Sequence, residues 1–437
     1  MDERKRKSFF LSLHIMRTLL HTLIALLFCT SLSAQSYQDL IRENPDRAAG
    51  VHHSYEYRPG EETRVPRGYK PFYVSHYGRH GSRRGTSSTA EKSFEYLSKA
   101  HELGILTSEG EELYRMVWAI HEDHVEMVGE LTERGGREHR AIAERMYRHF
   151  PSVWRSRRRT QVHVQSSNIP RCLLSMANFT SSLDDMAPRL VFDFITGDKV
   201  LNLLSHDYYD SRTILKAARA VKDSMEKATV NPRRFIESIF RGDPLQVAPD
   251  SLTLMYQVYA FGGMRQCTET PDADIYRRFF TVDELIALYR CYNARSYMIM
   301  GNSEEFGGNV IWAARGLVQD IIDRADEALQ SGSTTAADLR FGHDTGIMPL
   351  AGLIGLEGIG DRFNADAAAE EGWQSFEHLC MGSNIQMVFY RRRGREPLVK
   401  FYYNEREAKI KGLEGGPYYK WSELRAYLLR RIAETEI

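Results

Sequence analysis

One pentapeptide early in the sequence combines a histidine with two arginines. Residues 79–83 read Arg-His-Gly-Ser-Arg, and they follow the apolar stretch 71–74, Pro-Phe-Tyr-Val. A neutral imidazole can attack phosphorus, and two guanidinium groups can bind phosphate oxygens in fork geometry. The glycine lets the backbone come close to a bound group. The pentapeptide therefore indicates phosphoryl-transfer chemistry, although these five residues alone leave a basic surface turn open as an alternative.

A second motif with chemical potential lies far downstream, at residues 336–345, Ala-Ala-Asp-Leu-Arg-Phe-Gly-His-Asp-Thr. A short apolar strand pattern ends there in glycine, followed by His343 and Asp344, and the apolar residues after them recur at helical spacing. Both motifs thus lie at the ends of predicted strands. Because ligands of α/β sheets bind at the carboxyl ends of strands, we expect His343 and Asp344 to lie near His80.

Together the two motifs resemble those of the histidine acid phosphatases, the second branch of the histidine phosphatase superfamily. That family carries an RHGxRxP motif early and an HD motif late. Residues 79–85 match the first motif except that Gly85 replaces its proline, and residues 343–344 match the second. Residues 131–135, Leu-Thr-Glu-Arg-Gly, resemble the LTxxG segment of the family.

A third segment of the resemblance is residues 162–171, Val-His-Val-Gln-Ser-Ser-Asn-Ile-Pro-Arg. It is similar to the strand and helix start that deliver a third phosphate-binding arginine, here Arg171. Gln165 and Asn168 stand where the family usually has arginine and aspartate. A surface or helix-capping role for Arg171 therefore stays open as an alternative.

The resemblance implies roles for six residues. His80 would be the nucleophile that forms a phosphohistidine, and Asp344 would protonate the leaving oxygen. The substrate phosphate would be bound by Arg79, Arg83, Arg171 and His343. No metal or other cofactor is expected, because the arginines supply the charge that magnesium supplies elsewhere. For Asp344, capping of the helix that begins near Thr345 is an alternative that is compatible with proton donation.

The likeness is greatest to the phytase and multiple inositol polyphosphate phosphatase group. It implies an exported phosphomonoester hydrolase that acts on inositol polyphosphates such as phytate. Members of that group often carry a different residue at the position of Asp344, so a general acid phosphatase or a sugar phosphatase is an alternative. A catalytically inactive phosphate-ligand binding protein is a further one. The expected partner is a small phosphomonoester, and the oligomeric state is not predicted.

Two groups of basic residues outside the motifs could either bind a ligand or simply face the solvent. Arg84 could extend a basic rim toward a substrate with several phosphates, or it could be a solvated side chain. The run 155–159, Arg-Ser-Arg-Arg-Arg, could bind a polyanion, but such runs are usually exposed loops.

The N-terminal sequence has the pattern of an export signal. A basic segment at 4–7 precedes an apolar segment at 19–28, and Ser-Leu-Ser-Ala ends it at Ala34. This pattern predicts a signal peptide over 1–34 and hence a periplasmic or secreted protein with no membrane span after cleavage. Translation could start at Met1 or at Met16, since the second start gives a signal of more usual length.

The charge balance and the cysteines limit which partners and which disulfides can be expected. Without the five basic and two acidic residues of 1–34, the 58 residues of each sign fall to 53 and 56, a net charge of about −3. This balance gives no excess of positive charge for nucleic acid. Beyond Cys29 there are four cysteines, whose connectivity the sequence does not define: Cys172, Cys267, Cys291 and Cys380. Cys267 with Cys291 is a conceivable pair, and free buried thiols are the alternative.

Strand and helix patterns alternate in the first and last thirds of the chain. Strands are predicted at 70–75, 162–164, 337–341, 385–390 and 398–403. Helices are predicted at 89–101, 109–130, 138–149, 304–329 and 421–432, and the segment between them is helix-rich, with helices at 211–227, 250–261 and 281–297. The alternation predicts an α/β fold with a mainly parallel sheet flanked by helices. We expect a core at 35–184 and 301–437, phosphoglycerate-mutase-like by resemblance, and an inserted α-helical cap domain at 185–300.

Overall fold

The computed structural model describes residues 35–85, 87–205, 211–270, 272–306 and 308–434, so the predicted signal at 1–34 lies outside it. An eight-stranded sheet forms the centre of the fold. Its strands are β1 (Lys70–Arg79), β2 (Gln161–Ser166), β3 (Val191–Thr196), β4 (Thr335–Gly342), β5 (Asn384–Arg391), β6 (Leu398–Tyr403), β7 (Arg406–Ala408) and β8 (Tyr419–Lys420).

The sheet is mixed. Its strand order is β3-β2-β4-β1-β5-β6-β7, with β8 pairing with β6. The first four strands of this order are parallel, whereas β5 to β8 pair in antiparallel fashion, with β5 and β6 forming the predicted hairpin. The predicted α/β fold is confirmed, and the parallel pairing holds for the half of the sheet that carries the motifs.

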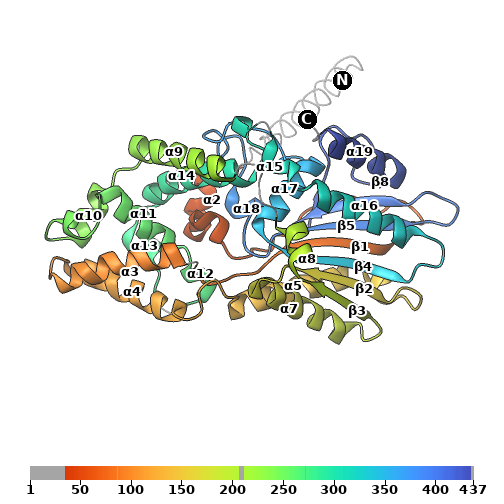
Figure 1. The fold of residues 1–437 in the computed structure, drawn as a ribbon, viewed down its shortest axis with the longest axis horizontal. Coiled ribbons are helices and arrows are strands. Elements are labelled where there is room, and N and C mark those ends of the chain that lie inside the picture. Colours follow the sequence, from red (N-terminus) through yellow and green to blue (C-terminus); the bar gives the residue numbers. More distant parts are fainter. Residues whose placement is uncertain (1–34, 86, 206–210, 271, 307, 435–437) are drawn as a thin grey trace, which may run out of the picture.

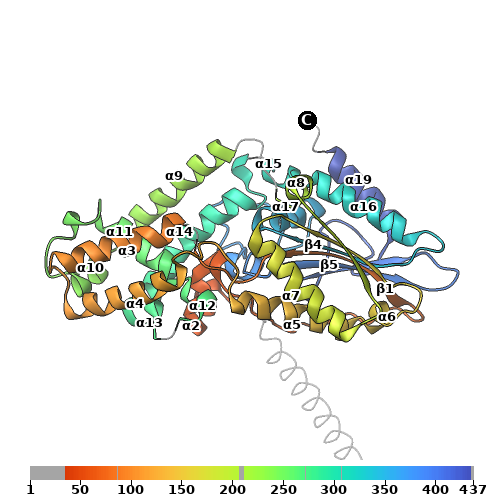
Figure 2. The same ribbon diagram turned by 60° about the horizontal axis from the view of Figure 1, so that its bottom comes forward.

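Helices cover both faces of the sheet (Figures 1 and 2). One face carries α5 (Glu133–His149), α6 (Pro151–Trp154) and α7 (Pro170–Met186). The opposite face carries α8 (Asp198–Leu204), α16 (Arg315–Leu329), α17 (Asp344–Ile354) and α19 (Trp421–Ala433). Pro170 occupies the first turn of α7, where its missing N–H costs nothing.

A group of helices lies beyond one end of the sheet (Figure 1). It comprises α3 (Ser87–Glu102), α4 (Ser108–His124), α9 (Ser211–Thr229), α10 (Arg233–Ile239), α11 (Ser251–Gly262), α13 (Ile275–Phe279) and α14 (Val282–Met300). Shorter helices fill the remaining connections: α2 (Tyr37–Glu43), η1 (Pro45–His52), η2 (Pro244–Gln246), α12 (Arg265–Thr268), η3 (Glu304–Phe306), α15 (Asn309–Trp312) and α18 (Ser375–His378). None of the helices within the described residues is long and apolar enough to cross a membrane.

The expected boundary between the core and the inserted domain, at residue 185, does not coincide with the end of the sheet. β3 pairs with β2 in register from Val191 to Thr196, so the sheet continues past that residue. In addition, α3 and α4 come before the expected insertion but pack against α11 and α10, respectively. The helical group is therefore built from two separate stretches of chain.

Two predicted helices are shorter than expected because of left-handed residues. The helix predicted over 109–130 ends at His124, since Glu126 and Gly129 have φ angles of 63° and 75°. The pattern at 304–329 is divided into η3, α15 and α16, and Gly308, with φ of 88°, precedes α15. Glycine reaches such angles at no steric cost, so it ends helices that the apolar periodicity would continue.

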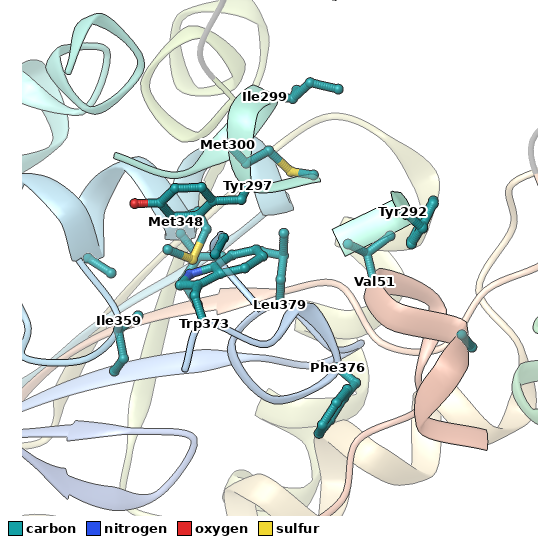
Figure 3. Packing of buried hydrophobic residues seen from close by; sticks show 14 of the residues in the cluster. Val51, Tyr292, Tyr297, Ile299, Met300, Met348, Ile359, Trp373, Phe376 and Leu379 are labelled. Atoms are coloured by element: carbon teal, nitrogen blue, oxygen red, sulfur yellow. The ribbon is translucent and has the colours of Figure 1, made fainter. Parts of the chain in front are cut away.

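The apolar core brings the loops around the sheet ends together. Figure 3 shows part of one cluster of buried residues, in which Val51 lies beside Tyr292 and Leu379 beside Trp373. The four described cysteines, Cys172, Cys267, Cys291 and Cys380, are buried free thiols. The pairing of Cys267 with Cys291 is therefore not formed.

Candidate active site

The first motif begins at the carboxyl end of β1. Register pairs Arg79 with Gly342, the last residue of β4, so the two motifs lie side by side. The backbone N–H of His80 donates to the Gly342 carbonyl at 3.0 Å, and the Nδ1 atom of the buried His80 ring lies 3.0 Å from the Gly81 carbonyl. A carbonyl can only accept, so Nδ1 carries the proton and Nε2 keeps its lone pair. This tautomer leaves Nε2 free to act as a nucleophile.

The loop that follows His80 is packed backbone to backbone against the start of α5. A Cβ atom at Gly81 would lie 2.6 Å from the Gly135 carbonyl oxygen, and one at Gly135 would lie 2.2 Å from the Ser82 carbonyl oxygen. Thr132 caps α5 by accepting the Gly135 N–H and donates its hydroxyl to the Ser82 carbonyl at 3.0 Å. The segment that resembles LTxxG therefore supports the nucleophile loop.

A buried carboxylate of the same helix also holds this loop. Glu138 of α5 accepts both the backbone N–H and the hydroxyl of Ser82, each at 2.7 Å. Burial raises the pKa of Glu138, while the hydrogen bonds from Ser82 oppose that shift. The sequence reasoning missed Glu138, because nothing in a helical glutamate signals such a contact.

Arg79 is held by the protein through its terminal nitrogens. Nη1 donates to the carbonyls of Val51, at 2.7 Å, and Leu379, at 2.5 Å. Nη2 forms an ion pair with Asp344 at 2.9 Å. Asp344 is the first residue of α17, and its other oxygen accepts the N–H of Thr345 at 2.9 Å. The carboxylate at the second motif is thus fixed by the arginine of the first.

Arg83 and Arg171 are much less engaged. Arg83 donates from Nη1 to the Arg84 carbonyl at 2.8 Å, and no hydrogen bond of Arg171 is found within the described residues. The Nε atoms of Arg79, Arg83 and Arg171 are all buried and lack a partner among those residues. Buried donors without partners are costly, so three of them at one place point to an anionic ligand.

His343 is held by its backbone and by its ring. Its N–H donates to the Tyr77 hydroxyl at 3.1 Å, and its Nε2 atom lies 2.9 Å from the Ser167 hydroxyl. The rings of His80 and His343 are perpendicular, with centroids 5.7 Å apart. Cys172 lies 3.5 Å from the same Nε2 atom. The two histidines therefore face a common space from different strands.

The local charges set the protonation of the site. Burial lowers the pKa of His80 well below its usual value, and the three arginines add to this effect. Burial, Arg171 and Arg79 likewise lower the pKa of His343 to about 4. Burial alone would raise the pKa of Asp344, but Arg79 and its neighbours outweigh it and lower that pKa to about 2. Both histidines are therefore neutral and Asp344 is ionised at neutral pH.

All six residues expected at the site meet at the adjacent ends of β1 and β4 and the start of α7. Among the described residues no group of three His, Cys, Asp or Glu side chains is arranged to hold a metal ion. His52, which the sequence reasoning missed, also lies here, since burial and the charges of Arg83 and Arg79 lower its pKa to about 3. A side chain at Gly85 would require Met264 to move, because a Cβ atom there would lie 2.5 Å from its Sδ atom.

Two basic features lie apart from this chemistry. Arg84 does not form a free rim, because its Nε and Nη2 atoms bind both carboxylate oxygens of Asp123 at 3.0 and 3.1 Å. In the run 155–159, Arg159 is buried, donates to the Thr335 carbonyl at 2.7 Å and stacks over Phe72. Thr335 begins β4, whose other end carries the site, so this run lies at the opposite end of the sheet.

Comparisons of sequence and of structure give different results. No protein-family model and no curated protein matches the sequence. The structure is similar to that of the Bifidobacterium longum multiple inositol polyphosphate phosphatase complexed with inositol hexasulfate, with a TM-score of 0.72 and 20% identity over 87% of this chain and 97% of that one.

Two phytases are similar as well. The phytase from D. castellii has a TM-score of 0.67 and 15% identity, over 92% of this chain and 91% of that one. The Hafnia alvei phytase complexed with tartrate has a TM-score of 0.54 and 12% identity, over 84% and 98%. The chain therefore has the fold of phytases and multiple inositol polyphosphate phosphatases, which confirms, at the level of the fold, the resemblance that its two motifs predict.

Proposed function

We propose that the protein is a phosphomonoester hydrolase that works through a phosphohistidine at His80. The observation that carries the proposal is an unprotonated Nε2 atom enclosed by three arginines whose Nε donors are buried without partners. A phosphate group would satisfy those donors and would bring its phosphorus to the nucleophile. A surface turn or a purely structural histidine would need neither the donors nor the lone pair.

In the first step, the Nε2 lone pair of His80 attacks phosphorus and the bond from phosphorus to the ester oxygen breaks. The charge that spreads over the phosphate oxygens is stabilised by Arg79, Arg83 and Arg171 and by a hydrogen bond from His343. The leaving oxygen takes a proton from the carboxyl group of Asp344, because an alkoxide is a poor leaving group.

In the second step, water attacks the phosphohistidine and the bond from phosphorus to Nε2 breaks. The water gives a proton to the carboxylate of Asp344, and the inorganic phosphate takes that proton with it when it leaves as its monoanion, so that Asp344 is ionised again. The free enzyme holds Asp344 ionised through Arg79. The proton for the first step therefore arrives with a substrate that binds as its monoanion, since the second pKa of a phosphate ester is about 6.

Inositol polyphosphates such as phytate are the proposed substrates. The supporting facts are the fold shared with phytases and the three guanidinium groups beside His80, of which Arg79 is paired with the carboxylate of Asp344. A neighbour of the same fold was crystallised with inositol hexasulfate, which carries the same ring and a similar number of anionic groups. We further propose that residues 1–34 export the protein to the periplasm or the medium.

The test is an activity panel with phytate, glucose 1-phosphate and p-nitrophenyl phosphate on the protein and on His80→Ala. We expect turnover of all three, with phytate preferred, and acid-labile labelling by substrate phosphate that is absent in His80→Ala. Preference for glucose 1-phosphate would favour a sugar phosphatase, and equal turnover of all three a general acid phosphatase. Binding of phosphate without turnover would show an inactive ligand-binding protein, and label on another residue would move the nucleophile.

A further inference from the structure

The residues around the start of α7 contact both motifs. Ser175 accepts the Gly81 N–H at 3.1 Å, and Cys172 lies 3.3 Å from the Gly342 carbonyl, to which its thiol donates. Ser167, just before the helix, lies 2.9 Å from Nε2 of His343. All three side chains are inaccessible to solvent. The start of α7, which carries Arg171, and Ser167 just before it thus also support the loop after His80 and the second histidine.

The hydrogen bonds of Ser167 define where its own proton goes. Its Oγ atom accepts the N–H of Ile169 at 3.2 Å, so one lone pair is already used. Within the described residues, the Ser167 hydroxyl proton reaches Nε2 of His343, and the other acceptor beside it is the sulfur of Cys172, which is a weak one. If Nε2 instead carried a proton and donated it, the buried hydroxyl would be left with only the weak sulfur acceptor, which is costly.

The backbone of His343 leaves little freedom to change this arrangement. Tyr77 donates its hydroxyl proton to the Leu204 carbonyl at 2.6 Å and accepts the His343 N–H at 3.1 Å. The Tyr77 hydroxyl fills the space over two glycines, since a Cβ atom at Gly342 or Gly346 would lie 2.2 or 2.0 Å from it. With the backbone fixed in this way, the ring contact with Ser167 decides which nitrogen holds the proton.

We propose that Ser167 is a positioning residue that holds the neutral His343 ring as its Nδ1–H tautomer. The Nδ1–H group has no partner within the described residues except the weak contact with Cys172 Sγ at 3.9 Å. It is therefore available to donate a hydrogen bond to a phosphate oxygen without His343 having to be charged. This catalytic consequence rests on the proposed phosphatase function, whereas the tautomer itself does not.

The first test reads the tautomer in the unmodified protein by NMR of ¹⁵N-labelled histidine at pH 7, with the His343 signals assigned by their loss in His343→Gln. The expected result is a protonated Nδ1 and an unprotonated Nε2. A protonated Nε2 in the wild-type protein would overturn the proposal. Because no substrate is present, this result is independent of whether the protein is a phosphatase.

The second test compares Ser167→Ala with Ser166→Ala, a matched control whose hydroxyl is also buried but donates to the Ser167 carbonyl and not to the ring. In Ser167→Ala we expect the Nε2–H tautomer to appear and kcat for p-nitrophenyl phosphate to fall about tenfold, the worth of one hydrogen bond. Ser166→Ala should keep the tautomer and stay within about twofold in kcat. An unchanged His343 tautomer in a folded Ser167→Ala would overturn the proposal.

Discussion

Two sides of the site treat their arginines differently. On one side, the terminal nitrogens of Arg79 make three contacts with the protein, including the ion pair with Asp344. On the other side, Arg83 makes one hydrogen bond and Arg171 makes none within the described residues. The terminal nitrogens of Arg79 are thus a built part of the fold, whereas Arg83 and Arg171 leave most of their donors unpaired among the described residues. Three arginines of one site therefore differ in how much they stabilise or destabilise the free protein.

The paired and the unpaired arginines are expected to contribute differently to the stability of the fold and to the binding of a ligand. A guanidinium group paired in the free protein stabilises the fold and orients the acid beside it. One that lacks a partner destabilises the free protein and gains its hydrogen bonds only when an anion arrives. We therefore expect substitutions on the two sides to divide their effects between stability and activity in opposite proportions.

The largest effect is expected from Asp344→Asn, on the Arg79 side. Asparagine keeps the acceptor for the Thr345 N–H, so the start of α17 should survive. Loss of the general acid should slow an alkyl phosphate such as phytate by about 10²–10⁴ in kcat, but p-nitrophenyl phosphate far less, because its phenolate leaves without a proton. The measurement is the ratio of the two slowing factors.

The control for this prediction is circular dichroism of the variant, which should match that of the wild-type protein. Equal slowing of both substrates in a folded variant would mean that Asp344 only orients Arg79. The acid would then have to be another group.

A second prediction compares Arg79→Gln with Arg171→Gln. Both should lower kcat/KM by about 10- to 100-fold, since each removes one charge-assisted contact with phosphate. Only Arg79→Gln should also destabilise the fold, by about 2–3 kcal/mol, because it orphans a partly exposed Asp344. Arg171→Gln should stay within about 0.5 kcal/mol. Urea unfolding gives both values, and equal destabilisation would remove the distinction between the two sides.

The third prediction concerns pH. His80 and His343 have lowered pKa values, with His343 at about 4, so both stay neutral as the pH falls from 7 and take up protons only in more acidic solution. Asp344, at about 2, is ionised throughout this range and cannot bring the proton itself. For phytate, kcat/KM should therefore be highest between about pH 4 and 6 and fall above about 6, where the ester loses its own proton. A profile that stays flat to pH 8 would contradict this origin of the proton.

The smallest effect is expected from chelation. If the arginines alone neutralise the phosphate, activity after dialysis against EDTA should stay within about twofold of the untreated protein. Loss of turnover that magnesium or zinc restores would require a metal-dependent mechanism. A single assay with p-nitrophenyl phosphate decides between the two results.

The approach of the two motifs could be predicted from the sequence, because each follows a strand pattern and parallel strands end at the same edge of a sheet. The apolar spacing predicts where most helices lie but does not predict the residues at which they end. Periodicity continues past His124, whereas the helix ends there and Glu126 is left-handed, which the apolar spacing does not reveal. β3 was hidden for a similar reason, since a six-residue edge strand with exposed side chains lacks a clear alternation.

The supporting residues could not be predicted. Glu138 and Ser82 are 56 positions apart, and Ser167 and His343 are 176 apart, so only the folded chain brings them together. Arg84 shows the converse error, because a basic residue beside a phosphate motif suggests a ligand contact until its carboxylate partner Asp123 is known. Side-chain identity suggests the chemistry at a site, and tertiary contacts decide which residues supply it.

The contact between Gly81 and Gly135 restricts how this scaffold can be altered. Where two backbones touch, their spacing is fixed by atomic radii, and there is no side chain whose length could be tuned. Any larger residue at either position would move the nucleophile loop away from α5. If the proposed function holds, changes in substrate range are therefore expected in parts of the chain away from this contact, such as the helices beyond the sheet, while the loop after His80 keeps its dimensions.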